Sequence, residues 1–130
     1  MSKRLSIWLL CMAAFILMAS AVASVNYTNF TMTFTDLDEF QTVTSDTTSK
    51  NNPTRARLYI YSNTSSVKSV FRAGTTPTGS PVTGRYYDRT TDGRMMNYTV
   101  NLAQNTRVYL QGRPDSSISS CTITGAFGAG

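Results

Sequence analysis

Histidine is absent from the 130-residue sequence, and only two cysteines are present. Without histidine, the chain lacks the commonest general base and the commonest zinc ligand. Cys11 lies in an apolar N-terminal segment, so Cys121 is the only cysteine in the remainder and no internal disulfide can form there. A Gly-x-Ser-x-Gly nucleophile elbow is also missing. We therefore predict that the protein is not an enzyme and has no catalytic residue, metal site or cofactor.

Acidic residues are few: seven Asp and Glu stand against twelve Lys and Arg, which gives a formal net charge of +5. Without Lys3 and Arg4 the charge falls to about +3, mostly from arginine. This mild basicity favours anionic surfaces. The chain has no lysine-rich arm and no recognisable nucleic-acid-binding motif, so we expect no nucleic acid among its partners.

Long hydrophobic runs are missing except at the N-terminus. Residues 2–4 are Ser-Lys-Arg, residues 5–18 are apolar and uncharged, and Ala21 and Ala23 provide the small residues that a signal peptidase reads. We interpret 1–23 as a secretory signal peptide in helical form and 24–130 as a secreted, extracellular domain. An uncleaved anchor is the alternative, because 5–23 could nearly span a bilayer. We expect membrane contact only through the signal peptide before cleavage.

The hexapeptide 56–61 is the clearest structural signal after the N-terminus. Its inward set is Ala56, Leu58 and Ile60, and its outward set is Arg57, Tyr59 and Tyr61. Strict alternation of this kind predicts a strand with one face on a core.

Most later segments repeat the alternation, and no segment shows sustained helical periodicity. We predict an all-β fold, a small antiparallel β-sandwich of seven or eight strands preceded by the signal-peptide helix. The strands are expected at 25–35, 40–44, 55–62, 66–73, 85–89, 95–102, 107–112 and 117–127. The strands 55–62 and 66–73 should form a hairpin, 74–84 the longest loop, and 90–93 a turn. The side chains expected in the core are Leu58, Ile60, Val100, Leu110 and Ile123.

The outward residues of two expected strands form the candidate binding surface, because arginine alternates with tyrosine on both. If these strands are neighbours, the sheet presents guanidinium groups among tyrosine rings, which suit the stacking of sugars and the pairing of phosphates. The alternative is an ordinary exposed sheet face on which arginine stems cover the tyrosines. The surface consists of Arg57, Tyr59 and Tyr61 on one strand and Arg107 and Tyr109 on the other, extended by Tyr86.

Two other groups of residues are candidate chemical sites. The acidic segment 36–39 (Asp-Leu-Asp-Glu) could hold a calcium ion, supply a carboxylate to a hydrolase through Asp36 or Asp38, or be a solvated turn. Cys121 lies in phase with Ile123, which predicts a small buried core residue; an intermolecular bridge is the alternative.

Two C-terminal runs, 107–113 (RVYLQGR) and 120–127 (SCTITGAF), complete a short β domain that follows directly on the signal peptide. This organisation resembles the lactococcin-like bacteriocins and related small secreted proteins of Gram-positive bacteria. In that group the chain similarly closes with a strand that enters a Ser/Thr-Gly-aromatic step. Here Phe127 is the aromatic, displaced by Ala126, and a glycine-rich tail stands where that group places tryptophan and polar residues. The resemblance implies a β-sandwich, an extracellular address and a role in competition between bacteria.

These observations lead to three functional hypotheses. The first is a secreted, non-enzymatic, bacteriocin-like protein that binds a cell-envelope component or surface glycan through the arginine and tyrosine side chains. The second is a structural or adhesin-like subunit that assembles through strand edges. The third is a small carboxylate-dependent hydrolase.

Overall fold

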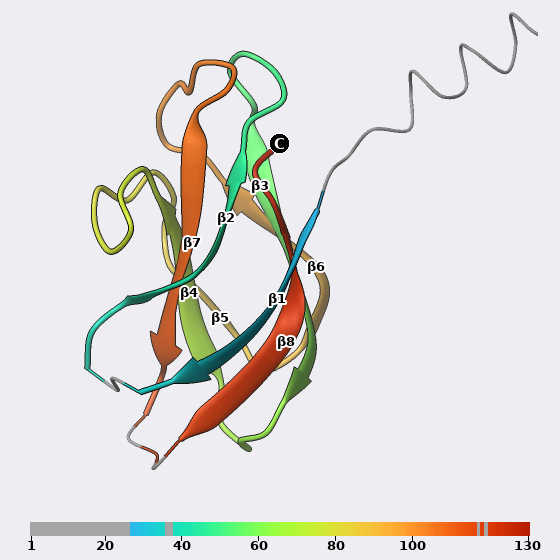
Figure 1. The fold of residues 1–130 in the computed structure, drawn as a ribbon, viewed down its shortest axis with the longest axis vertical. Coiled ribbons are helices and arrows are strands. Elements are labelled where there is room, and N and C mark those ends of the chain that lie inside the picture. Colours follow the sequence, from blue (N-terminus) through green and yellow to red (C-terminus); the bar gives the residue numbers. More distant parts are fainter. Residues whose placement is uncertain (1–26, 36–37, 117, 119) are drawn as a thin grey trace, which may run out of the picture.

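The computed structural model describes residues 27–35, 38–116, 118 and 120–130, and the expected signal peptide at 1–23 lies outside them. Within these residues the chain is all β, with eight antiparallel strands in two four-stranded sheets and no helix (Figure 1). Sheet A contains, in spatial order, β1 (Thr28–Phe34), β8 (Cys121–Gly128), β3 (Arg55–Asn63) and β6 (Thr91–Asn97). Sheet B contains β2 (Gln41–Thr47), β7 (Arg107–Pro114), β4 (Ser69–Gly74) and β5 (Tyr86–Asp88). The expected all-β class is confirmed.

The strand pairs are nested. β1 pairs with β8, β2 with β7, β3 with β6 and β4 with β5, while β8 also pairs with β3 and β7 with β4. This connectivity is that of one long double strand rolled into two sheets, the jelly-roll scheme. It brings the first and last strands side by side in sheet A, although nearly the whole domain separates them in sequence (Figure 1).

The inward side chains of both sheets form one hydrophobic core, so the two sheets have a sandwich-like arrangement. Sheet A contributes Phe34, Leu58, Ile60, Met96, Ile123 and Phe127, and sheet B contributes Phe71, Ala73, Val108 and Leu110, all at most 2% exposed. Four of the five core residues expected from the alternation are therefore confirmed. Val100 is the exception, because its side chain is 48% exposed.

The error at Val100 has a local cause. The expected strand 95–102 and the turn before it are displaced: β6 starts at Thr91 and ends at Asn97, so Asp92 and Gly93 lie inside a strand. Gly93 has φ of +129° and is an extra residue between the partners of Leu58 and Tyr59, which makes it a β-bulge. Val100 lies beyond the strand, where the alternation no longer applies.

The expected hairpin between 55–62 and 66–73 is also wrong, because β3 and β4 belong to different sheets. The chain crosses from sheet A to sheet B just after Asn63, whose buried side-chain amide donates to the carbonyls of Val67 and Arg89. Leu58 and Phe71 consequently belong to opposite layers of one core. Alternation predicts which side of a strand is buried, and it does not identify the strand's partner.

The glycine-rich C-terminal segment is held in place by hydrogen bonds and burial. Ala129 is fully buried, its amide donates to Asp46 Oδ2 (2.8 Å), and its carbonyl accepts a hydrogen bond from the Tyr98 hydroxyl (2.6 Å). The carbonyl of Gly130 accepts the Ser49 amide (2.7 Å). These contacts tie the end of β8 to two other segments, the end of β2 with the residues after it and the residue that follows β6.

Candidate functional site

The outer side of β3 carries three of the six predicted site residues. Arg57, Tyr59 and Tyr61 alternate with the buried Ala56, Leu58 and Ile60, so all three point away from the core, as the sequence predicts. Tyr27, just before β1, joins them: its ring meets that of Tyr59 edge to face, with centroids 5.4 Å apart and planes at 85°. We call Tyr27, Arg57, Tyr59 and Tyr61 the tyrosine face.

The rings of Tyr59 and Tyr61 lie side by side. Their centroids are 6.2 Å apart and their planes are inclined by only 30°, and the Tyr61 side chain is 63% exposed. Neighbouring rings with similar orientation form a platform on which apolar faces of a ligand can stack. Interaction with the side chains of Tyr59 and Tyr27 raises the pKa of the Arg57 guanidinium, so an exposed cation lies beside this platform.

Two β-bulges shape the platform. Tyr61 is skipped in the pairing of β3 with β8, between Ile60 and Ser62, so Tyr61 and Ser62 are both exposed and the ring is turned outward. The second bulge is at Gly93 in β6, the strand that pairs with β3 on the side away from β8. Gly93 lies next to the Tyr59 ring: a Cβ there would be 3.2 Å from a ring atom. A side chain at this position would crowd the Tyr59 ring and would also be strained by the positive φ of Gly93.

A hollow lies at each end of the tyrosine face. The first, of about 220 Å³, is lined by Tyr27 and Arg57 of that face together with Lys50, Thr54, Arg55, Gly128 and Gly130. Its three charged side chains are all basic. The second, of about 420 Å³, is lined by Tyr61 with Ile60, Thr90, Thr91 and Asp92. The aromatic platform thus connects a basic hollow to a polar one.

Hydroxyl groups cover the neighbouring part of sheet A. Thr33 and Thr122 share a hydrogen bond between their hydroxyls (2.8 Å), and Ser62 bonds to Thr124 in the same way. These rows lie across β1, β8 and β3, beside the tyrosine face. A surface of aromatic rings and hydroxyl groups suits a carbohydrate, which has apolar C–H faces and a rim of hydroxyls.

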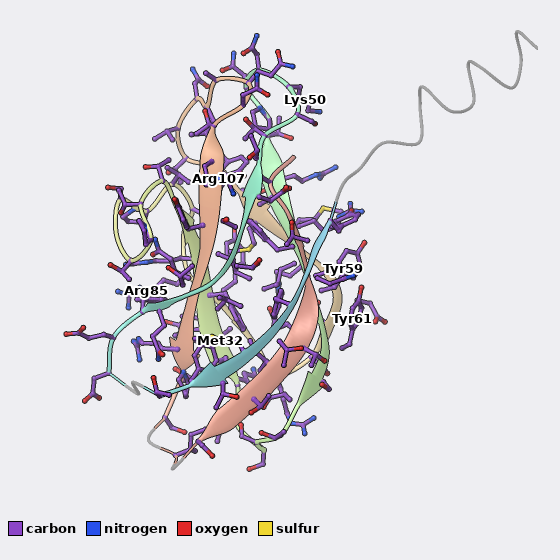
Figure 2. The ribbon with its side chains drawn as sticks, viewed as in Figure 1. Met32, Lys50, Tyr59, Tyr61, Arg85 and Arg107 are labelled. Atoms are coloured by element: carbon purple, nitrogen blue, oxygen red, sulfur yellow. The ribbon has the colours of Figure 1, made fainter. Side chains whose placement is uncertain are left out.

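The other three predicted site residues lie elsewhere. Arg107 and Tyr109 are on β7 in sheet B, so the two arginine–tyrosine strands are not neighbours and do not form a combined surface. Figure 2 shows Tyr59 and Tyr61 on the flank formed by sheet A, and Arg85 and Arg107 toward the flank formed by sheet B. Arg107 donates to Ser45 Oγ (2.9 Å) on the adjacent β2. The alternation identified outward residues correctly, but the assumed adjacency of their strands was wrong.

Tyr86 has a structural position. It packs against the core from β5, and its hydroxyl accepts the backbone amide of Asn97 (2.8 Å), which joins sheet B to sheet A. Arg94 lies over its ring at 5.9 Å from the centroid and forms a bidentate ion pair with Asp88. These contacts remove Tyr86 from the binding surface.

Sequence reasoning missed a second group of residues, on the outer side of sheet B. Three guanidinium groups surround the ring of Phe40: Arg72 at 3.9 Å, Arg85 at 5.2 Å and Arg113 at 5.3 Å from its centroid. They come from β4, the segment before β5, and the end of β7, so only the sheet order brings them together. No periodicity in the sequence marks such a group.

The acidic segment 36–39 and Cys121 are the remaining candidate sites. Asp36 lies outside the described residues, whereas Asp38 is exposed and lines the hollow around Phe40. Cys121 is confirmed as a buried core residue, and its thiol donates to Asn63 Oδ1 (3.1 Å), so the sulfur is not exposed to a second chain. Among the described residues, no cluster of three or more His, Cys, Asp or Glu is placed to hold a metal ion.

In the same part of the chain, the structure contains no helix that is long and apolar enough to cross a membrane. Comparison with protein-family models, with curated proteins and with solved structures gave no match. The strand order and the exposed tyrosines define the class of protein: it is an all-β protein with two sheets in jelly-roll order and an aromatic outer face.

Proposed function

We propose that the protein is a secreted, non-enzymatic binding protein whose tyrosine face recognises a surface glycan that carries anionic groups. The observation that carries this proposal is the platform of Tyr59 and Tyr61, with ring centroids 6.2 Å apart, beside Arg57. Sugar rings stack on exposed tyrosines through their C–H faces, and the nearby hydroxyl rows offer donors and acceptors to the sugar hydroxyls.

The anionic character of the ligand is inferred from the basic hollow. Lys50, Arg55 and Arg57 line it without a carboxylate side chain among its lining residues, and a guanidinium pairs well with the carboxylate, phosphate or sulfate of an acidic sugar. A glycan that lies along β3 would place one sugar on the tyrosines and its charged neighbour in this hollow. The bacteriocin-like role that the sequence resemblance implies remains a prediction, and such a protein would use this face to find its target cell.

The test is retention on purified bacterial cell walls and on alginate, a polymer of acidic sugars. Tyr61→Ala should weaken binding about tenfold, because truncation of an aromatic residue that stacks on the ligand costs more than about 1 kcal/mol in a binding site. Tyr87→Ala is the matched control, since Tyr87 is 44% exposed but lies on β5 of sheet B. Equal retention of Tyr61→Ala and the parent protein would reject the tyrosine face.

The alternative of assembly through strand edges has one supporting observation. Of the four edge strands, β5 has only three residues, and β2 and β6 contain register shifts, which discourage pairing with another chain. β1 is regular over Thr28–Phe34 and offers an open edge. Sedimentation velocity tests this alternative: oligomers that grow with concentration would favour it, and a strict monomer would exclude it. The hydrolase hypothesis gains no support from the described geometry.

A further inference from the structure

The hollow around Phe40, on the outer side of sheet B, is separate from the tyrosine face. It has a volume of about 330 Å³ and is lined by Asp38, Glu39, Phe40, Arg72, Thr78, Arg85 and Arg113. We call it the arginine pocket. Three arginines against two carboxylates leave it with an excess of positive charge, and Phe40 provides an apolar wall against which the guanidinium planes are held.

Arg72 is fixed in the pocket before any ligand arrives. Its Nε donates to Gln111 Oε1 (2.7 Å) and its Nη2 to the carbonyl of Thr78 (3.0 Å). Gln111 is fully buried and donates in turn to the carbonyls of Thr76 and Gly79, which holds the 74–84 loop over sheet B as a wall of the pocket. A binding group that is already oriented loses little conformational entropy when a ligand binds.

Arg113 contributes an unsatisfied donor. Within the described part of the chain, its Nε is buried without a hydrogen-bond partner, and its Nη1 makes only a long contact of 3.4 Å to the carbonyl of Pro114. A buried donor on a charged group is costly when it lacks an acceptor. Burial, followed by the positive charges of Arg85 and Arg113, also lowers the pKa of Arg72, so the cluster is electrostatically strained. An anion between the guanidinium groups would offset the repulsion among these positive charges.

We propose that the arginine pocket binds one oxyanion, a phosphate or sulfate group, held by Arg72, Arg85 and Arg113 against the wall formed by Phe40. Forked guanidinium groups match the oxygens of such an anion, and three of them converge here from separate strands and loops. This site lies on the sheet opposite the tyrosine face, so the two can be tested independently.

Inorganic phosphate is the probe, and the chemical shifts of backbone amides in NMR report its binding. Parent protein should show saturable binding with shifts at residues 40, 72, 85 and 113, weaker at high sodium chloride because charge attraction is screened. Arg85→Gln should weaken binding about tenfold, the loss expected for a charge-assisted hydrogen bond. Arg107→Gln, an exposed arginine on the same sheet, should bind as the parent does.

Two comparisons complete the experiment. Tighter binding of glycerol 3-phosphate than of inorganic phosphate identifies the ligand as a phosphate ester on a larger molecule, and equal binding identifies the free ion. Three results would overturn the proposal. They are the absence of saturable binding, shifts confined to the hollow of Lys50 and Arg55, and an equal loss of phosphate affinity in Arg85→Gln and Arg107→Gln. Because Tyr61→Ala should leave phosphate binding unchanged, failure here is distinguishable from failure of the glycan proposal.

Discussion

At the scale of single residues, Tyr98 shows how position alters chemistry. It follows β6 and donates its hydroxyl to the carbonyl of Ala129, at the end of β8. Burial first, and the negative charge of Asp46 second, raise the pKa of Tyr98 well above its ordinary value of 10.0. The phenol therefore keeps its proton in the folded protein under conditions in which an exposed tyrosine would lose it.

The raised pKa predicts a loss of stability in alkaline solution. Below pH 10 the contribution of Tyr98 is fully present. Above it, the unfolded chain releases the phenolic proton while the folded chain retains it, so the free energy of unfolding should fall by up to about 1.4 kcal/mol per pH unit. Urea unfolding between pH 8 and 11 should show a shallower decline for Tyr98→Phe than for the parent, although the variant loses about 1 kcal/mol at neutral pH with its hydrogen bond. Equal slopes would contradict this account.

At the scale of elements, β8 is the centre of sheet A, since it lies between β1 and β3 and pairs with both along nearly its whole length. Gly125 is the point of closest approach. It faces Phe30 on one side and Ile60 on the other, and a Cβ there would overlap the carbonyl oxygen of Tyr59 and lie 2.8 Å from Phe30 Cζ. The absence of a side chain lets three strands come together over the core.

Gly125→Ala should therefore destabilise the protein by about 1–3 kcal/mol, the usual cost of overpacking. Gly84→Ala is the matched control: a Cβ at Gly84 would meet nothing within 4 Å, and its effect should stay within about 0.5 kcal/mol. Denaturant midpoints of the two variants give the comparison. A Gly125→Ala protein as stable as the Gly84→Ala protein would show that β8 and β3 separate without cost.

At the scale of elements, the sequence predicts which side chains are buried but not which strands are paired. Side-chain alternation correctly predicted that Leu58 and Ile60 are buried and that Tyr59 faces outward, because a strand has a period of two wherever it is regular. Tyr61 also faces outward as predicted, although it lies in a bulge. It failed where a bulge breaks that period, as at Gly93, and beyond the end of a strand, as at Val100. It also gave no information on partners, so β3 and β7 were wrongly joined in one surface.

At the scale of the whole molecule, both sheets depend on contacts between distant segments. In the pairs β1–β8 and β2–β7, the two strands lie near opposite ends of the domain's sequence. The core residues Ile123 and Phe127 come from the last strand. Sheet A without β8 would leave β1 with no partner in its own sheet and β3 with one open side. The fold is thus complete only when its last strand is present.

This dependence predicts the behaviour of a shortened chain. Residues 24–116, which include seven of the eight strands, should show no cooperative unfolding transition, whereas residues 24–130 should show one. Circular dichroism during thermal unfolding makes the comparison. A shortened chain that melts cooperatively would mean that sheet B and the rest of the core fold without β8.

Pairing of the first strand with the last also has a consequence for biosynthesis. The ribosome releases β8 only after every other strand has been made, so sheet A cannot close while the polypeptide is still growing. Contacts between such distant segments also form slowly once the chain is free. A newly made chain therefore stays incompletely folded until its last strand has been released.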